Sequence, residues 1–342
     1  MTNHNKIGVL LLNIGTPDKP NTASVRKYLK EFLSDPRVVD IPWLLKNLLL
    51  YLFILPSRPA KSAKAYQAIW RPEGSPLLYY SLRMQENLHQ LLGKNYQVEL
   101  GMCYRNPSIE KGIEKLYQAQ CDHIIIFPLF PQYSSAATGA STEKALRLIA
   151  KKWNIPSLET KNNFYNNPGF INAYSCKIKE GCANKNIEHY LFSFHGLPER
   201  HIDKSEGKLL ECSRIHPCPQ VTMNNHYCYR AQCYSTSRLL AQHLAIPDTD
   251  YTVSFQSRLG VTAWIKPYTD EILVTLYNKG IRHLAVACPS FIADCLETIE
   301  EIGIRAKAQW LKLGGETLTL IPCLNDDKNW LNALAKMINP NL

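Results

Sequence analysis

A histidine and three carboxylates stand at points where apolar runs of the sequence end. His195 closes the aromatic-rich run at 190–194, and a glycine that ends a strand follows it at once. Asp294, Glu297 and Glu301 follow the run "LAVACPSF" with the spacing i, i+3, i+7, which predicts that they share one helix face. A neutral imidazole and carboxylates can bind a divalent metal ion or accept protons. The alternatives are a hydrogen-bonded core histidine and a solvated acidic helix start.

The sequence segments that would position these residues occur twice in the chain. "GVLLLNIGTP" at 8–17 is echoed by "HYLFSFHGLP" at 189–198, and "HIIIFPLFP" at 123–131 by "HLAVACPSF" at 283–291. Strand-like and helical stretches alternate in both halves. We therefore predict an α/β fold with one parallel sheet, flanked by helices, in each half.

The length of 342 residues favours two domains, which we place at 1–170 and 171–342. The second would carry His195 and the acidic helix. Ligands of such folds bind at the carboxyl ends of the strands, so a cleft between the domains should hold a small molecule. No GxGxxG follows the first apolar run and no GxxxxGK[ST] occurs in the sequence, which argues against a nucleotide.

Charge and hydropathy restrict the partners. Lys and Arg number 39 against 29 Asp and Glu, a formal net charge of +10 that favours an anionic partner. The sequence has no block of like charge and no RNA-binding motif, so we expect no nucleic acid. The amino-terminal apolar segment is short and has no small-residue cleavage site, so we interpret it as a strand and expect a cytoplasmic protein.

The longest apolar stretch, "WLLKNLLLYLFILP" at 43–56, contains Lys46 and is too short to span a membrane. We call it the lip: it is either a core helix or an exposed surface that touches a membrane or an apolar ligand. Arg58, Lys61 and Ser75 follow it and would suit the carboxylates of a flat hydrophobic ligand. Tyr133 and Trp264 could supply flat walls for such a ligand. The alternatives are a solvated surface for the cations and ordinary packing for the two aromatic rings.

Four of the eleven cysteines form a group, Cys212, Cys218, Cys228 and Cys233. Their spacings of five, nine and four intervening residues lack the CxxC pairs of common zinc sites. Four separate thiols, a zinc site and a [2Fe-2S] cluster all remain open on spacing alone. Thiolates that converge would order a loop with little strand or helix pattern.

Six segments, taken together, resemble the characteristic segments of the ferrochelatase family, which inserts ferrous iron into protoporphyrin IX. They occur in family order from residue 7 to about 305, and they are "LLNIGTP", "FLSDPRVVD", "FPLFPQYSSAATG", "SFHGLPERH", "SFQSRLGVTAWIKPYTDE" and "ACPSFIADCLETIEE". The resemblance implies two Rossmann-like domains of the chelatase type with a porphyrin cleft between them, the first of which carries the lip. It also implies a lyase that releases two protons and forms protohaem in the terminal step of haem biosynthesis.

The resemblance assigns roles residue by residue. His195 matches the catalytic histidine and Glu297 the carboxylate across the cleft, both as Fe²⁺ ligands, with Asp294 and Glu301 in an acidic ridge. The positions that match porphyrin contacts are Ile14, Arg58, Lys61, Ser75, Tyr133 and Trp264. The chain departs from the family at Cys103, where members often have arginine, and at Cys295, where some have histidine.

The resemblance implies Fe²⁺ as a substrate and no cofactor for insertion. Some bacterial members that carry a [2Fe-2S] cluster have a similar insertion ending in "CYRAQC", which favours that cluster on Cys212, Cys218, Cys228 and Cys233. Peripheral contact with the inner membrane is expected, and monomer and homodimer both stay open. The alternatives are a haem or porphyrin carrier with His195 as axial ligand, and a related chelatase for coproporphyrin or another divalent metal.

Overall fold

The computed structural model describes residues 6–206, 218–260 and 262–342. The chain divides into two compact units. Unit 1 consists of residues 1–130, 134–163 and 331–342, and unit 2 of residues 131–133 and 164–330. The predicted domain ranges, 1–170 and 171–342, remain a prediction about which parts fold independently.

Unit 1 contains a parallel four-stranded sheet in the order β2-β1-β3-β4. Its strands are β1 (Lys6–Gly15), β2 (Tyr96–Tyr104), β3 (Cys121–Pro128) and β4 (Ser157–Thr160). Near-continuous apolar runs form the inner strands because helices cover both faces of a parallel sheet. Its helices are α1 (Thr22–Ser34), α2 (Trp43–Leu48), the π-helix η1 (Leu49–Ile54), α3 (Leu55–Ile69), α4 (Pro76–Leu92), α5 (Ile109–Gln118), the π-helix η2 (Ser135–Gly139) and α6 (Ala140–Ile149).

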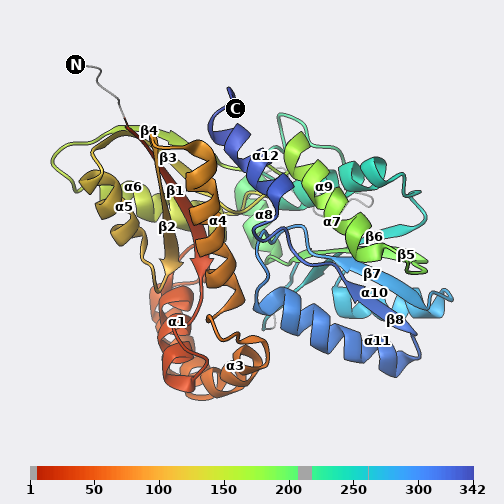
Figure 1. The fold of residues 1–342 in the computed structure, drawn as a ribbon. Coiled ribbons are helices and arrows are strands. Elements are labelled where there is room, and N and C mark those ends of the chain that lie inside the picture. Colours follow the sequence, from red (N-terminus) through yellow and green to blue (C-terminus); the bar gives the residue numbers. More distant parts are fainter. Residues whose placement is uncertain (1–5, 207–217, 261) are drawn as a thin grey trace. The chain divides into compact units, whose positions relative to one another are not determined.

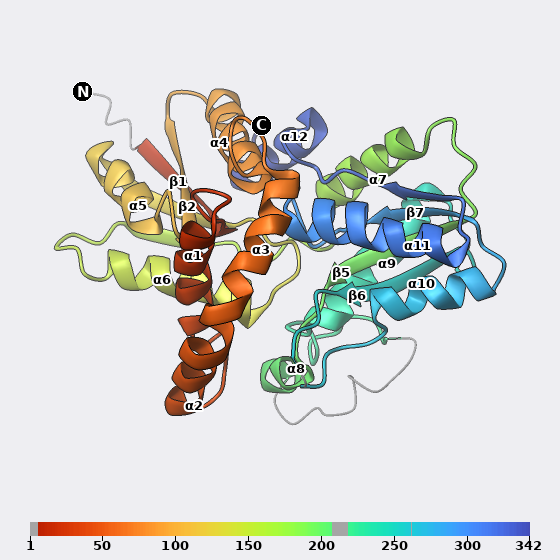
Figure 2. The same ribbon diagram turned by 90° about the horizontal axis from the view of Figure 1, so that it is seen from below.

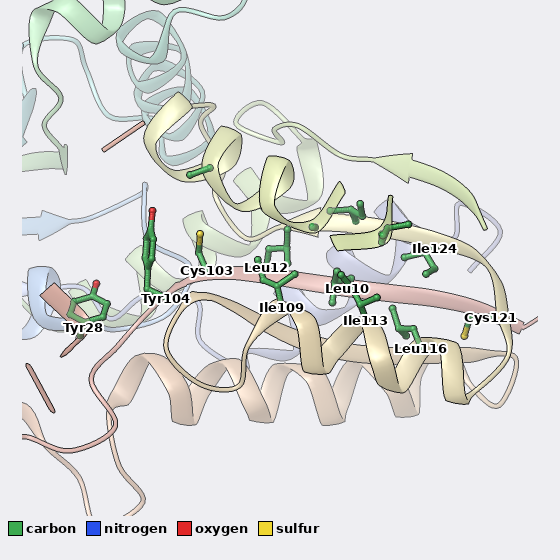
Figure 3. Packing of buried hydrophobic residues seen from close by; sticks show 14 residues of the cluster. Leu10, Leu12, Tyr28, Cys103, Tyr104, Ile109, Ile113, Leu116, Cys121 and Ile124 are labelled. Atoms are coloured by element: carbon green, nitrogen blue, oxygen red, sulfur yellow. The ribbon is translucent and has the colours of Figure 1, made fainter. Parts of the chain in front are cut away.

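Helix α4 covers one face of this sheet, and α5 and α6 cover the other (Figure 1). On the α5 side, Leu10 and Leu12 of β1 pack with Ile109 and Ile113 (Figure 3). These two leucines alternate with residues that face α4, as the period of a strand requires. The strand ends at Gly15, where φ is +109° and a Cβ atom would lie 2.0 Å from the carbonyl oxygen of Tyr104.

The lip is exposed and is not a core helix. Helix α1 packs beside α3 (Figures 1 and 2). The chain that connects these two helices passes through α2 and η1, which form most of the lip. Leu50 is buried with Leu33 and Leu55, and the Lys46 ammonium donates a hydrogen bond of 2.6 Å to the carbonyl of Ser34. The large apolar side chains that are 42% to 72% exposed are Trp43, Leu44, Leu45, Leu48, Leu49, Tyr51, Leu52 and Phe53. Among the described residues, none of the helices combines the length and the hydropathy needed to cross a bilayer.

Unit 2 repeats the arrangement with the strand order β6-β5-β7-β8. Its strands are β5 (His189–His195), β6 (Tyr251–Gln256), β7 (His283–Ala287) and β8 (Thr317–Leu320). Its helices are α7 (Pro168–Cys182), α8 (Glu199–Glu206), α9 (Tyr229–Leu244), α10 (Thr269–Asn278), the π-helix η4 (Leu296–Ala306) and α11 (Lys307–Leu313), and α12 (Lys328–Ile338) runs from unit 2 into unit 1. Helices α7 and α9 lie on one face of the sheet, and α10 and α11 on the other (Figure 1). The predicted α/β class with two parallel sheets is confirmed.

Candidate active site

His195 is the last residue of β5, as predicted, and it is half-buried. Its Nδ1 lies 2.6 Å from the carbonyl oxygen of Gly196. A carbonyl can only accept a hydrogen bond, so Nδ1 carries the proton of the neutral ring and Nε2 keeps a free lone pair. The rings of Trp264 and Phe291 lie with their centroids 6.5 and 6.2 Å from the imidazole. The strand end therefore presents a proton acceptor among aromatic side chains.

The main chain of His195 is held by two side chains. Its N–H donates a hydrogen bond of 3.1 Å to the Oγ of Ser290, and its carbonyl accepts one of 2.8 Å from the hydroxyl of Tyr229. The pairing of β5 with β7 ends at Phe192, so these side chains replace the missing strand partner. Neither support was predicted, since nothing in the sequence pattern relates residues 34 and 95 positions away to the strand end.

Glu297 lies in the first turn of η4, and its carbonyl oxygen accepts a hydrogen bond of 2.6 Å from the side-chain amide of Gln256. Gln256 ends β6, is buried and in turn accepts 2.7 Å from the hydroxyl of Ser193 in β5. Glu301, one turn further along η4, accepts hydrogen bonds from the main-chain N–H and the hydroxyl of Ser257 at 2.8 and 2.5 Å. The ends of β5 and β6 thus anchor the acidic helix.

Glu301 shares an electrostatic environment with the other two predicted groups. Burial raises its pKa above the ordinary range of a glutamate; the hydrogen bond from Ser257 opposes that shift, the neighbouring Glu297 adds to it, and His195 opposes it. The structure therefore brings His195, Glu297 and Glu301 together at one edge of the unit 2 sheet. No group of three His, Cys, Asp or Glu in the described part of the chain is arranged to hold a metal ion.

Asp294 lies outside the acidic face, and the prediction that all three carboxylates share one helix face is wrong for this residue. A capping box made by Cys295 and Thr298 starts η4 only after Asp294. The Asp294 carboxylate is buried and accepts hydrogen bonds from the N–H of Cys323 at 3.1 Å, the amide of Asn325 at 2.8 Å and the hydroxyl of Thr298 at 3.2 Å. Its oxygens join the start of η4 to the loop after β8.

The two predicted aromatic walls are both half-buried in unit 2. Trp264 donates its indole N–H to the carbonyl of Leu259 at 2.8 Å and packs against Gly196, where a Cβ atom would lie 3.2 Å from the indole ring. The main-chain N–H of Tyr133 donates to the side-chain oxygen of Gln232 at 2.7 Å. The Tyr133 ring packs edge to face on Tyr227 with centroids 5.2 Å apart.

The remaining predicted contacts belong to unit 1. Ile14 is the penultimate residue of β1, and the buried hydroxyl of Ser75 accepts a hydrogen bond of 2.8 Å from Thr16, two residues after Ile14. Arg58 and Lys61 lie three residues apart on α3, on neighbouring parts of its surface. Burial lowers the pKa of the Arg58 guanidinium, whereas Lys61 is exposed.

Arg105 pairs with two carboxylates of unit 1. This arginine follows the cysteine that departs from the family pattern, and its guanidinium forms ion pairs with Asp18 and Glu31, the second at 2.8 Å. Burial tends to raise the pKa of Asp18, but hydrogen bonds from Arg105 and Asn106 lower it overall. Arg105 therefore stabilises the loop after β2.

Three of the four predicted cluster ligands lie in the segment 218–233, which we call the cysteine segment. Cys218, Cys228 and Cys233 are buried, and Cys212 lies outside the described residues. Burial raises the pKa of Cys233 well above that of an ordinary thiol; a hydrogen bond with Tyr229 opposes the shift, and the neighbouring Cys228 and Cys218 add to it. The donor set of gathered thiols is chemically suited to zinc or iron–sulfur binding, although the described members alone form no metal-binding group.

Comparison with known proteins gives consistent matches. The family model described as "Ferrochelatase" matches residues 6–342. A curated "Ferrochelatase" of Coxiella burnetii is 50% identical over 340 residues, which cover 99% of this chain and 95% of that protein. A "Ferrochelatase" of Legionella pneumophila is 50% identical over 337 residues, with 98% and 99% covered. The solved structure of SirB from Bacillus subtilis with Fe³⁺ has a TM-score of 0.55 at 11% identity over 97% of this chain and 94% of that one, a likeness of fold alone.

Proposed function

The chain belongs to the ferrochelatase family and is an enzyme that inserts ferrous iron into a porphyrin, and from this premise we propose that His195 and Glu297 carry the insertion. The observation that supports this most is the distance of 2.6 Å between the carbonyl oxygen of Gly196 and Nδ1 of His195. Its Nδ1–H is bound to the carbonyl of Gly196, which leaves Nε2 as a base at the carboxyl edge of the sheet.

A porphyrin loses two pyrrole protons when Fe²⁺ enters the ring. Nε2 of His195 accepts a proton, and the imidazolium that forms is stabilised by the Gly196 carbonyl and by the carboxylate of Glu301 nearby. Glu297 offers a hard oxygen donor that suits an incoming ferrous ion or a second proton. Glu301 completes the acidic ridge. Asp294 stabilises the start of the same helix, because its carboxylate accepts a hydrogen bond from the hydroxyl of Thr298.

The proposed porphyrin is protoporphyrin IX. Trp264, Tyr133 and Ile14 would contact its faces, because flat apolar side chains bind a macrocycle by burial of its surface. Arg58, Lys61 and Ser75 would contact the propionates, consistent with the net charge of +10. Competition between protoporphyrin and coproporphyrin under anaerobic conditions with Fe²⁺ tests this assignment, since a higher kcat/KM for coproporphyrin would contradict it.

The catalytic assignment is tested by His195→Ala. Because the imidazole is half-buried and its ring makes one hydrogen bond, we expect a folded variant with at least a hundredfold lower rate of metalloporphyrin formation. The reaction is followed by the metalloporphyrin spectrum, and circular dichroism checks the fold. His283→Ala, at the amino end of β7, is the matched control and should keep full activity. A folded His195→Ala variant with a rate near wild type would remove His195 from the mechanism.

We further propose that Cys212, Cys218, Cys228 and Cys233 hold a [2Fe-2S] cluster. The burial of three of these thiols near one another supports the site, and thiolates are the usual ligands of such clusters. Metal insertion involves no net electron transfer, so the cluster would be structural or regulatory. Anaerobically purified protein should contain two irons and two acid-labile sulfides per chain, and Cys228→Ser should lose them. One zinc per chain would exclude the cluster, and no metal would exclude the site.

The exposed lip supports a third proposal, peripheral contact of a cytoplasmic enzyme with the inner membrane. Apolar side chains that gather on one surface bind a bilayer interface by burial. The double variant Leu49→Ser and Phe53→Ser should release the protein from anionic vesicles or raise the KM for porphyrin. Leu82→Ser with Leu91→Ser, which changes two exposed leucines of α4, is the control and should do neither. Unchanged binding and KM in the lip variant would contradict the proposal.

A further inference from the structure

We propose that Tyr229 is a positioning residue that fixes the main chain of His195 and connects it to the cysteine segment. The inference rests on the proposed role of His195 and extends it to a residue that does not touch the reacting atoms. Its basis is the hydrogen bond of 2.8 Å that the Tyr229 hydroxyl donates to the carbonyl oxygen of His195.

The first step concerns the strand end. In β5, residues up to Phe192 pair with β7, and the partner strand then ends at Ala287. A main-chain carbonyl beyond that point needs another donor, because an unpaired buried carbonyl costs free energy. Tyr229 is 5% exposed and supplies that donor, while Ser290 satisfies the N–H of the same residue. These two side chains thus fix the orientations of the peptide groups before and after His195.

The second step concerns the imidazole. Its Nδ1–H is bound to the carbonyl of Gly196, the next residue, whose own N–H donates 2.8 Å to the carbonyl of Gln256. The direction of Nε2 therefore depends on the peptide planes at 195 and 196. Loss of the Tyr229 hydroxyl frees the carbonyl of His195 and lets those planes tilt, and a misplaced base lowers turnover more than it lowers binding.

The third step concerns the cysteine segment. Tyr229 directly follows Cys228, which caps α9 through a contact of 3.4 Å between its sulfur and the N–H of Ala231. The Tyr229 hydroxyl is also within hydrogen-bonding reach of the Cys233 thiol, four residues along the same helix. Gln232, between the two cysteines, holds the main chain of Tyr133. One turn of α9 therefore contacts both a base and a pocket wall of the proposed site.

The test is Tyr229→Phe in the full-length protein, because phenylalanine keeps the ring and removes only the hydroxyl. We expect kcat for Fe²⁺ insertion to fall about tenfold, the factor that one hydrogen bond corresponds to, with little change in the porphyrin KM. The ¹⁵N signals of the His195 ring should move, and the pH profile of kcat should shift. Tyr251→Phe is the matched control: it removes a hydroxyl that bonds Asp248 at the amino end of β6, and it should change none of these readouts.

Unchanged kcat and unchanged His195 signals in a folded Tyr229→Phe variant would overturn the inference. If that variant does not fold, Ser290→Ala replaces it, because Ser290 bonds both the N–H of His195 and the Tyr229 hydroxyl and so helps to hold that hydroxyl in place; unchanged His195 signals there would overturn the inference equally. The two proposals fail separately. A fully active His195→Ala variant removes the catalytic role, whereas the ring signals still report whether Tyr229 positions His195.

Discussion

The side-chain amide of Gln256 donates a hydrogen bond of 2.6 Å to the main-chain carbonyl of Glu297. The residue that ends β6 therefore fixes the first turn of the acidic π-helix η4. A carbonyl oxygen has two lone pairs, so the first-turn carbonyl of Glu297 can accept this bond in addition to one from an N–H further along η4. Glu297 is held in this way from a strand of the sheet.

Gln256→Glu tests that relationship. It places an oxygen against the carbonyl oxygen of Glu297 in a buried position, so we expect kcat to fall at least tenfold and the free energy of unfolding to fall by about 1–3 kcal/mol. Chemical denaturation and the insertion assay measure the two effects. Gln309→Glu is the matched control, because Gln309 donates 2.8 Å to the carbonyl of Asp270 near the surface. Equal effects of the two variants would show that the position of Glu297 does not depend on Gln256.

Asp294 and Glu297 should respond to substitution in opposite ways. Asp294→Ala leaves the N–H of Cys323 and the amide of Asn325 without their buried acceptor, so the free energy of unfolding should fall by about 3 kcal/mol. Glu297→Gln removes one charge from a half-buried side chain, so stability should change by less than about 0.5 kcal/mol while turnover falls strongly. Denaturant melts and steady-state kinetics on both variants separate the two roles. A stable Asp294→Ala variant would show that these hydrogen bonds contribute little, and a strong loss of turnover in it would place the carboxylate in the iron path.

The strand ends could be predicted from the sequence because their signals are local. The apolar run before His195 and the glycine after it suffice to place an imidazole at the carboxyl end of β5. The echo of "GVLLLNIGTP" in "HYLFSFHGLP" predicts two similar sheets, and that prediction is also confirmed.

The supports of the site could not be predicted, because they join residues far apart in the chain. Tyr229, Gln256 and Ser290 reach their partners across 34, 41 and 95 residues. Helical spacing placed Asp294 with Glu297 because it carries no information about where a capping box begins the helix. Only tertiary contacts decide these features, and they override local propensity.

A pH dependence of stability should come from His189, at the other end of β5. Burial lowers its pKa below the ordinary 6.5; Asp250 opposes the shift. The unfolded chain then binds more protons than the folded protein below pH 6.5, so the stability due to neutral His189 is present above that pH and lost as pH falls. His189→Gln should flatten the fall in unfolding free energy below pH 6.5. A slope identical to that of wild type would show that His189 is not the group responsible.

Two adjacent leucines of the lip should behave differently when truncated. Leu50 is 1% exposed and packs with Leu33 and Leu55, so Leu50→Ala should lower the free energy of unfolding by about 2–5 kcal/mol. Leu49 is 42% exposed, and Leu49→Ala should change the free energy of unfolding by less than about 0.5 kcal/mol. Urea denaturation measures both. If Leu49→Ala lowered the free energy of unfolding as much as Leu50→Ala does, Leu49 would belong to the packed core and not to an exposed surface.

The two sheets agree in details that strand order alone does not require. The N–H of Met102 in β2 donates 2.7 Å to the carbonyl of Pro107, and the N–H of Phe255 in β6 donates 2.8 Å to the carbonyl of Pro267. In each case the proline stands two residues before the first residue of the next helix. A π-helix follows the third strand in both units.

Such agreement allows the two sheets to be compared position by position. Met102 pairs with Asn13 and Phe255 with Phe194, so the next residues, Ile14 and His195, occupy corresponding positions in the two sheets. Unit 1 has an aliphatic side chain at this position and unit 2 an imidazole. The same strand end therefore offers a nonpolar surface in one unit and a side chain able to accept a proton in the other, so the two halves of one architecture present different chemistry at equivalent points.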